Sequence, residues 1–370
     1  MIARVVSSLY NRTKMTANDL ERTKFLGDIA DILQPLGYTL HEEQPHISGE
    51  RAHMSRTKMV LMGTDPKGNT VVIKASKHPL GIKEIRQEKV ARDVLAQLSF
   101  AVDELLQAEE LFFEERGGFL FFVTAYIPQD EIFVTRPLEE QFFLALRAFE
   151  AQETFHATTY AHSKEIKKHF AVYTPATYIS SFKKFIEEIE AEHKDTTLSS
   201  YLARAYELLS SEVVTLERYG NFLTHTDFVP HNMRVHKRAI YALDLTSVHF
   251  GNKYEGWARF LNYMVAHNPQ LERTLVNYLE TNRPDEYLNL RLMRLYKLGF
   301  LLSYYARLLP NTMGNHREIT LLRIALWTRV LGALLDDTTV PEEVIETYTT
   351  SRNSLRTEEE KARQRDFAVT

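Results

Sequence analysis

One stretch of the sequence, Asn221 to Gly251, gathers the residue types that phosphoryl-transfer chemistry needs. Its centre reads His-Thr-Asp-Phe-Val-Pro-His-Asn from residue 225 to residue 232, and a second acid, Asp244, follows a short apolar run. Phosphoryl transfer requires a base at the attacking hydroxyl and oxygen ligands for the metal that bridges the phosphates. Asp227 suits the base, and Asn232 and Asp244 suit Mg²⁺, which prefers oxygen donors.

Three histidines in the same stretch leave a second interpretation open, a transition-metal site of a hydrolase. His225, His231 and His236 lie close together in sequence, but the chain has no cysteine and no Glu-x-x-His pair accompanies them. The metal-hydrolase site is therefore the minor alternative.

The loop resembles that of the aminoglycoside phosphotransferase family, whose relatives include choline kinases and other small-molecule kinases. The family loop reads His-x-Asp-x-x-x-x-Asn followed by Asp, and His225, Asp227, Asn232 and Asp244 match it position by position. The resemblance implies a catalytic Asp227, Mg²⁺ at Asn232 and Asp244, and ATP as the phosphate donor.

The sequence departs from the family shortly after this loop. The family carries a Gly-Asp-Pro-x-x-Asp-Leu-Ala-like segment, whereas here the second aspartate position is Gly256. The neighbouring Glu255 is the acid that could substitute for it, starting from a different backbone position.

A lysine on a predicted strand is the next landmark. Short β-prone runs at residues 58–63 and 69–75, joined by an Asp-Pro-Lys-Gly turn, predict a small antiparallel sheet. By the resemblance, Lys74 at the end of the second run contacts the ATP phosphates. Glu88, on a helix predicted at residues 81–98, is its expected ion-pair partner, and Glu84, one turn earlier, is the competitor.

The remaining nucleotide contacts follow from the same resemblance. The turn from Ser48 onward would cover the phosphates, although Gly49 is its only glycine. Residues 105–115 and 119–127 predict a hairpin around the Arg-Gly-Gly turn. The end of its second strand, at Thr124, Ala125 and Tyr126, is the expected adenine site.

The rest of the chain is helical by pattern. The amphipathic segments expected around the loop span residues 16–36, 138–158, 175–192, 198–219, 254–266, 270–280, 287–309 and 316–335. An acidic run at Glu187, Glu188, Glu190 and Glu192 either faces a cationic substrate or is a solvated surface, the usual role of such runs. Arg291, Arg294, Arg307 and His316 are basic residues that could contact the substrate.

Composition bounds the class of protein. The chain has 370 residues, 44% of them hydrophobic, with a formal net charge of −4, so it can bury a substantial core and has no overall basic field for nucleic acid. No apolar run is long enough to span a membrane. The absence of cysteine fits a cytoplasmic protein.

Together these landmarks predict an α+β, two-lobed, protein-kinase-like fold. The expected divisions are an N-terminal helical extension (1–37), a nucleotide-binding lobe (38–128), a helical lobe with the catalytic loop (129–350) and a charged tail (351–370). The expected function is ATP- and Mg²⁺-dependent transfer to a small-molecule hydroxyl of an aminoglycoside, amino alcohol or sugar-like acceptor. The alternatives are a nucleotide-binding scaffold with little turnover and, less favoured because Leu245-Thr246 follows Asp244, a protein kinase.

Overall fold

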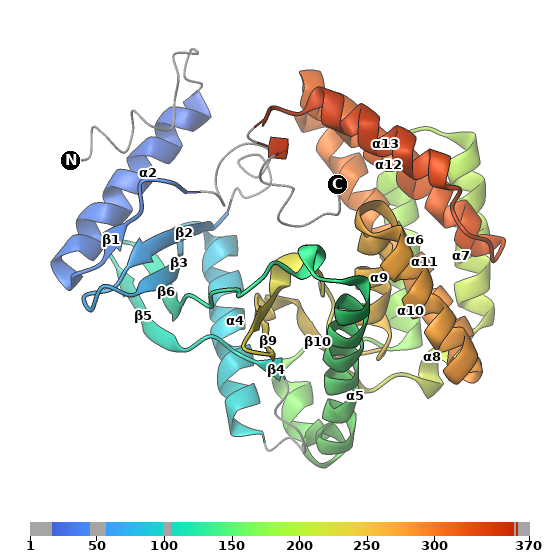
Figure 1. The fold of residues 1–370 in the computed structure, drawn as a ribbon, viewed down its shortest axis with the longest axis horizontal. Coiled ribbons are helices and arrows are strands. Elements are labelled where there is room, and N and C mark those ends of the chain that lie inside the picture. The colour runs from blue at the N-terminus through green and yellow to red at the C-terminus, as the bar shows by residue number, and fades with distance from the viewer. Residues whose placement is uncertain (1–16, 45–56, 99–104, 359, 362–370) are drawn as a thin grey trace. The chain divides into compact units, whose positions relative to one another are not determined.

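The computed structural model describes residues 17–44, 57–98, 105–358 and 360–361 (Figure 1). The chain divides into two compact units. The first contains the chain up to Asp93 together with Gln107–Pro128, and the second contains Val94–Leu106 and the chain from Gln129 onward. The segments that carry Lys74 and Asp227 therefore belong to different units.

The first unit is built on a five-stranded antiparallel sheet with the strand order β1-β2-β3-β6-β5. The strands are β1 (Thr39–Leu40), β2 (Met59–Thr64), β3 (Thr70–Ser76), β5 (Glu110–Arg116) and β6 (Phe119–Ala125). Two helices begin in this unit, α2 (Ala17–Leu33), which continues into the 3-10 turn η1 (Gln34–Leu36), and α4 (Pro79–Gln97).

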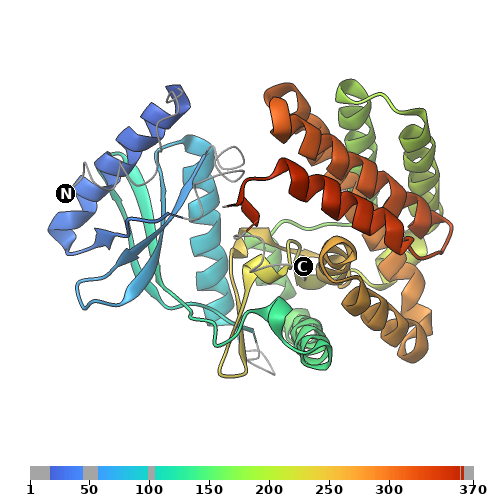
Figure 2. The same ribbon diagram turned by 45° about the horizontal axis from the view of Figure 1, so that its top comes forward.

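The sheet is covered on both faces, α2 on one and α4 on the other (Figure 2). Because side chains alternate along a strand, Phe121 joins the cluster formed with α2, and Phe122 joins Ile85 of α4. On β3, Ile73 belongs to the α2 cluster. The adjacent Lys74 is consequently directed to the α4 face.

The prediction that one strand of a hairpin spans residues 105–115 is wrong. Leu105–Leu106 form a separate strand, β4, which pairs in parallel with β9 (Ala239–Ala242) of the second unit, and β5 starts only at Glu110. Both segments are apolar and β-prone, so their pattern does not reveal that they pair with different partners.

The second unit is mostly helical. Its helices are α5 (Leu138–His169), α6 (Pro175–Glu192), α7 (Thr196–Ser211), α8 (Val213–Arg218), α9 (Glu255–His267), α10 (Pro269–Asn282), α11 (Pro284–Leu308), α12 (Gly314–Leu335) and α13 (Glu342–Leu355). Its strands form two small sheets, β4-β9-β8 and β10-β7, with β7 at Phe222–His225, β8 at Met233–His236 and β10 at Val248–Gly251. The 3-10 turns are η2 (Phe133–Thr135), η3 (Pro230–Asn232), η4 (Leu245–Ser247) and η5 (Leu309–Asn311).

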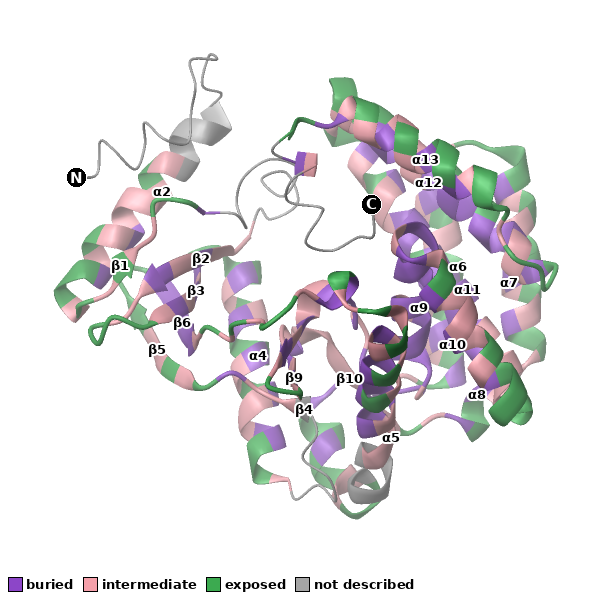
Figure 3. Cartoon of the chain, in the orientation of Figure 1, coloured by how far each residue is buried: buried purple, intermediate pink, exposed green. Residues whose placement is uncertain are grey.

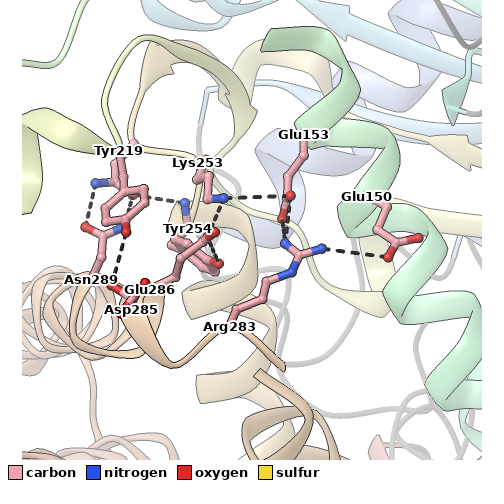
Figure 4. Close-up of polar contacts among 10 residues, drawn as sticks. Glu150, Glu153, Tyr219, Lys253, Tyr254, Arg283, Asp285, Glu286 and Asn289 are labelled. Carbon is pink, nitrogen blue, oxygen red and sulfur yellow. Dashed lines mark hydrogen bonds and ion pairs between the residues drawn. The ribbon is translucent and has the colours of Figure 1, made fainter. Parts of the chain in front are cut away.

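Helix α9 lies at the centre of this unit. Every residue from Glu255 to Ala266 is buried except Arg259, and α9 packs against α10 and α11 (Figure 3). A polar network fixes its start (Figure 4): Lys253 and the Tyr254 hydroxyl contact Glu286 of α11, and Arg283 binds both carboxylate oxygens of Glu153 of α5 at 2.7 Å. The position of α9 beside the predicted catalytic loop is thus set from α5 and α11.

Two helical boundaries differ from expectation. The segment expected at residues 198–219 breaks at Glu212 into α7 and α8. The charged tail from Ser351, expected to be either a surface helix or partly disordered, begins inside α13, where Arg352 is buried, and Arg356, directly after α13, is buried as well. The pattern missed α13 because Ile345 and Tyr348 are its only buried apolar residues. Among the described residues, no helix has the length and apolar character needed to cross a membrane.

Candidate active site

The predicted base, Asp227, lies in the turn after β7 with its side chain 43% exposed. Its Oδ1 accepts a hydrogen bond from Arg259 Nε at 2.7 Å, and its Oδ2 accepts one from Asn232 Nδ2 at 3.0 Å. The same Nδ2 donates to the Asp227 carbonyl at 2.9 Å. The carboxylate is therefore oriented from two sides and still accessible to a ligand.

Opposing effects act on the acidity of this carboxyl. Burial raises the pKa of Asp227, but the charge and hydrogen bond of Arg259, with the charges of His225 and Lys297, outweigh it and leave the pKa below its ordinary value. Asp227 is accordingly ionised at neutral pH.

The two predicted metal ligands are linked through the backbone, because the Leu243 N–H donates to the Asn232 carbonyl at 2.8 Å. Asn232 uses its Nδ2 on Asp227, and its Oδ1 has no hydrogen-bond partner among the described residues. Asp244 has φ 55° and ψ 62°, a left-handed conformation that is uncommon outside glycine, and Thr246 Oγ1 donates to its Oδ1 at 2.6 Å. One carboxylate and one amide oxygen fit a hard cation such as Mg²⁺.

His225 and Gln152 hold the loop from behind. The Nε2 of His225 donates to the Leu243 carbonyl at 2.8 Å, next to Asp244. The backbone N–H of His225 donates to Oε1 of the buried Gln152 of α5 at 3.3 Å. The histidine of the motif thus connects the loop to the residue before Asp244.

The close approach of α9 to Gln152 and the His225 backbone explains why residue 256 is a glycine. A Cβ at this position would lie 2.8 Å from Gln152 Oε1 and 3.2 Å from the His225 carbonyl. Gln152 therefore occupies the space into which a longer side chain at residue 256 would extend, and it supports the loop there.

Glu255 does not substitute for the missing aspartate. It is fully buried and pairs with Lys297 at 2.8 Å, while its second oxygen contacts His249 and accepts the Tyr178 hydroxyl at 2.9 Å. Burial raises the pKa of Glu255, but His249 and Lys297 lower it to about 2. This carboxylate is an internal charge that holds β10, α6 and α11 together.

In the first unit, Lys74 and Glu88 form the expected ion pair. Lys74 Nζ lies 2.6 and 2.5 Å from the two oxygens of Glu88, which is 3% exposed. Glu84 instead pairs with Lys58 at 3.4 Å. Glu88, rather than Glu84, therefore positions the lysine.

The predicted adenine segment lies at the end of β6. The N–H groups of Ala125 and Tyr126 are already used, donating to the carbonyls of Glu109 and Thr70 at 2.8 and 3.2 Å, and the Thr124 side chain is buried. The first N–H beyond them without a partner among the described residues belongs to Ile127. This amide, missed at the sequence level, is the better candidate donor.

Two further expectations concern the phosphate turn and the alternative histidine site. Ser48 and Gly49 lie outside the described residues. The three histidines of the loop do not converge: His225 binds Leu243, His231 packs edge-on against Tyr263, and His236 lies 2.9 Å from Asp130. Within the part of the chain that the structure describes, no three His, Cys, Asp or Glu side chains form a metal cluster.

Solved structures provide the comparison with known proteins, since no family model and no curated protein matches the sequence. A thermostable mutant of aminoglycoside phosphotransferase APH(4)-Ia, in ternary complex with ADP and hygromycin B, is 15% identical with a TM-score of 0.56, covering 85% of this chain and 97% of that one. ADP-bound APH(2'')-Ib is 13% identical with a TM-score of 0.54, covering 86% and 99%. A GDP and kanamycin complex of another APH(2'') enzyme is 14% identical with a TM-score of 0.58, covering 85% and 97%.

These similarities establish the fold. The chain has the two-lobed, protein-kinase-like α+β fold of the aminoglycoside phosphotransferases, as the loop motif and the lysine strand predicted.

Sequence reasoning missed two residues that contact the loop. Arg259 had a signal, because it is the one charged residue between Gly256 and Ala266 of a mostly buried helix, where a charged side chain is usually paired. Gln152 had no such sequence signal, since a glutamine on a long amphipathic helix is not distinguished from the other polar residues of that helix.

Proposed function

We propose that the chain is a phosphotransferase that moves the γ-phosphoryl group of ATP, with Mg²⁺, to a hydroxyl group of a small molecule. The observation that carries the proposal is the Asp227 carboxylate, fixed between Arg259 and Asn232 and linked through the loop to Asp244. Support comes from the shared fold, since the similar structures are aminoglycoside phosphotransferases, among them complexes with ADP, GDP, hygromycin B and kanamycin.

In this reaction the acceptor oxygen forms a bond to the γ-phosphorus, and the bond to the β–γ bridging oxygen breaks with its electron pair leaving on ADP. Asp227 orients the acceptor hydroxyl and takes its proton. Because its pKa is low, the proton transfers late, as expected for a reaction in which positioning dominates.

The other residues of the proposed site would bind ATP, the phosphate donor. Asn232 Oδ1 and the Asp244 carboxylate would bind Mg²⁺, which supplies charge neutralisation at the phosphates. Lys74, positioned by Glu88, would contact the phosphate oxygens, and the end of β6, from Thr124 through Ala125 and Tyr126 to Ile127, would bind the base. Ser48 and Gly49 stay predicted phosphate contacts, and a cytoplasmic location also stays a prediction.

One observation favours a second candidate, a nucleotide-binding protein with little turnover. Arg259 occupies one oxygen of the carboxylate that a hydroxyl would approach. The second oxygen accepts only the Asn232 amide among the described residues, which leaves the acceptor a route to the carboxylate.

Thermal unfolding with a non-hydrolysable ATP or GTP analogue tests the nucleotide part of the proposal. A nucleotide at one hundred times its Kd stabilises the folded chain by about 2.7 kcal/mol, and the shift should require Mg²⁺. Turnover with a panel of hydroxyl compounds then separates the candidates. A magnesium-dependent shift without turnover of any acceptor favours the second, and the absence of any nucleotide shift contradicts both.

A further inference from the structure

Helix α9 carries a row of residues that begins at the catalytic loop. Arg259, Tyr263 and His267 are spaced by four, so they lie on one face of the helix. Arg259 binds Asp227, the Tyr263 ring packs against His231 at 5.4 Å, and His267 stacks on Tyr263 at 3.9 Å. The row therefore runs about 12 Å along α9 from the Asp227 carboxylate.

Arg352 of α13 and Arg356, the residue directly after that helix, act electrostatically on His267 at the end of this row. Helix α13 packs against α9 and α12, and Arg352 and Arg356 are 5% and 8% exposed. Burial lowers the pKa of His267, and the nearby charges of Arg352, His231 and Arg356 lower it further. We call Arg259, Tyr263, His267, Arg352 and Arg356 the basic strip.

Arg352 is the informative member of the basic strip. Its Nε and Nη2 donate to Oδ1 of the neutral Asn353 at 3.1 and 3.0 Å, and its guanidinium lies 5.3 Å from the Tyr348 ring centroid. No carboxylate pairs with it among the described residues. A buried cation costs several kcal/mol unless an anion compensates it, so this arrangement indicates an anion supplied by a ligand.

Two residues considered for acceptor contacts, one acid and one arginine, are engaged within the protein. In the acidic run of α6, Glu188 accepts the Ser303 hydroxyl at 2.5 Å and lies 3.6 Å from Arg307. Arg294, a candidate substrate contact, pairs with Glu272 at 2.6 Å. Glu188 and Arg294 are therefore already paired within the protein.

We propose that the basic strip binds the acceptor, and that the acceptor is a hydroxyl compound with an anionic end, a phosphate or a carboxylate, rather than a polycation. This inference rests on the proposed function. The hydroxyl of this acceptor would lie at Asp227 and its anion at Arg352.

Binding to the full chain, saturated with Mg²⁺ and a non-hydrolysable ATP analogue at fixed ionic strength, tests the proposal. Glucose, glucosamine and glucose 6-phosphate share one scaffold and differ in charge, and inorganic phosphate is the minimal probe. We expect glucose 6-phosphate and phosphate to bind at least tenfold more tightly than glucosamine.

Arg352→Gln is the test variant. Arg329→Gln, at an exposed position of α12, is the control that removes the same charge elsewhere. Arg352→Gln should weaken glucose 6-phosphate binding at least tenfold without lowering the unfolding temperature, because it removes an uncompensated buried charge. A structural arginine would give the opposite result, lower stability with unchanged anion binding. Arg329→Gln should bind like the unmodified chain.

Three results would overturn the proposal: tighter binding of glucosamine or kanamycin than of the anionic probes, unchanged anion binding by Arg352→Gln, or no binding of either anionic probe. Failure of the proposed function is distinct, because it appears as the absence of a nucleotide-dependent shift before any acceptor is added.

Discussion

At the scale of single residues, Arg259 is the neighbour that lowers the pKa of Asp227 most strongly. Arg259→Gln removes the charge that lowers the pKa of this carboxyl and leaves the burial that raises it. The acid limb of the kcat–pH profile should therefore move to higher pH, toward neutrality. Basal ATP hydrolysis can report it before an acceptor is known.

Arg259→Lys is the control, since it keeps the charge and loses the Nε geometry. Its acid limb should stay near that of the unmodified chain. An unchanged limb in Arg259→Gln would show that the arginine does not set the protonation of Asp227.

The ion pair on β3 and α4 gives a second prediction at this scale. Lys74→Ala should lower kcat/KM on the order of 10²-fold, because it removes a charged contact to the transferring group. Glu88→Ala should act in the same direction but more mildly, and the double variant should cost little more than Lys74→Ala. Glu84→Ala is the matched control, one turn earlier on α4 and paired with Lys58 instead; a loss there with a silent Glu88→Ala would contradict the assignment.

At the scale of elements, Gln152 of α5 supports the predicted catalytic loop and fills the space beside Gly256. Gln152→Ala leaves the buried His225 N–H without its acceptor, which costs about 1–3 kcal/mol of unfolding free energy. Chemical denaturation measures this loss. Kinetics should show lower kcat with nearly unchanged nucleotide affinity.

Gly256→Asp in the Gln152→Ala background tests whether an aspartate at residue 256 can support the loop in place of Gln152. The space freed by Gln152 lies next to the Cβ direction of residue 256, so the aspartate should recover part of the lost stability and rate. In the unmodified background the same aspartate should destabilise, since its Cβ would lie 2.8 Å from Gln152 Oε1. If Gly256→Asp changed stability and rate equally in both backgrounds, an aspartate at residue 256 would not be acting in place of Gln152.

The elements also show what sequence can predict. The strand with Lys74 and the helix with Glu88 have strong local patterns, and their alternation and spacing bring the two side chains together. The loop motif predicts Asp227, Asn232 and Asp244 as site residues because all three lie within one short segment. Gln152 and Arg259 reach the loop from distant helices, and β4 pairs with a strand far along the chain, so local pattern could not place them. α13 was missed because Ile345 and Tyr348 are its only buried apolar residues, too few for a clear helical pattern.

At the scale of the whole molecule, the buried Glu255 makes stability depend on acid pH. A carboxyl whose pKa is lower in the folded state stabilises the fold above its unfolded value and loses that contribution as the pH falls. The pKa of Glu255 falls from 4.5 to about 2, so roughly 3 kcal/mol should be lost between these pH values. Urea denaturation at steps between pH 7 and pH 2 measures this loss.

Glu255→Gln should remove this part of the pH dependence and cost about 3–5 kcal/mol at neutral pH, because it leaves Lys297 buried without its counter-charge. Glu255→Gln combined with Lys297→Met should be less destabilised than Glu255→Gln alone. A single variant as stable as the unmodified chain would contradict the role given to this network.

In the proposed site, Asp227 binds the acceptor hydroxyl, and Asn232 and Asp244 bind the metal. The direct test is the affinity of a non-hydrolysable ATP analogue as a function of Mg²⁺ concentration for Asp227→Asn, Asn232→Ala and Asp244→Ala. Asp227→Asn should keep nucleotide affinity and its magnesium dependence while turnover falls about 10²–10⁴-fold. Asp244→Ala should lose magnesium-dependent affinity, with Asn232→Ala between the two. Loss of nucleotide binding in Asp227→Asn together with unaltered magnesium dependence in Asp244→Ala would contradict the account.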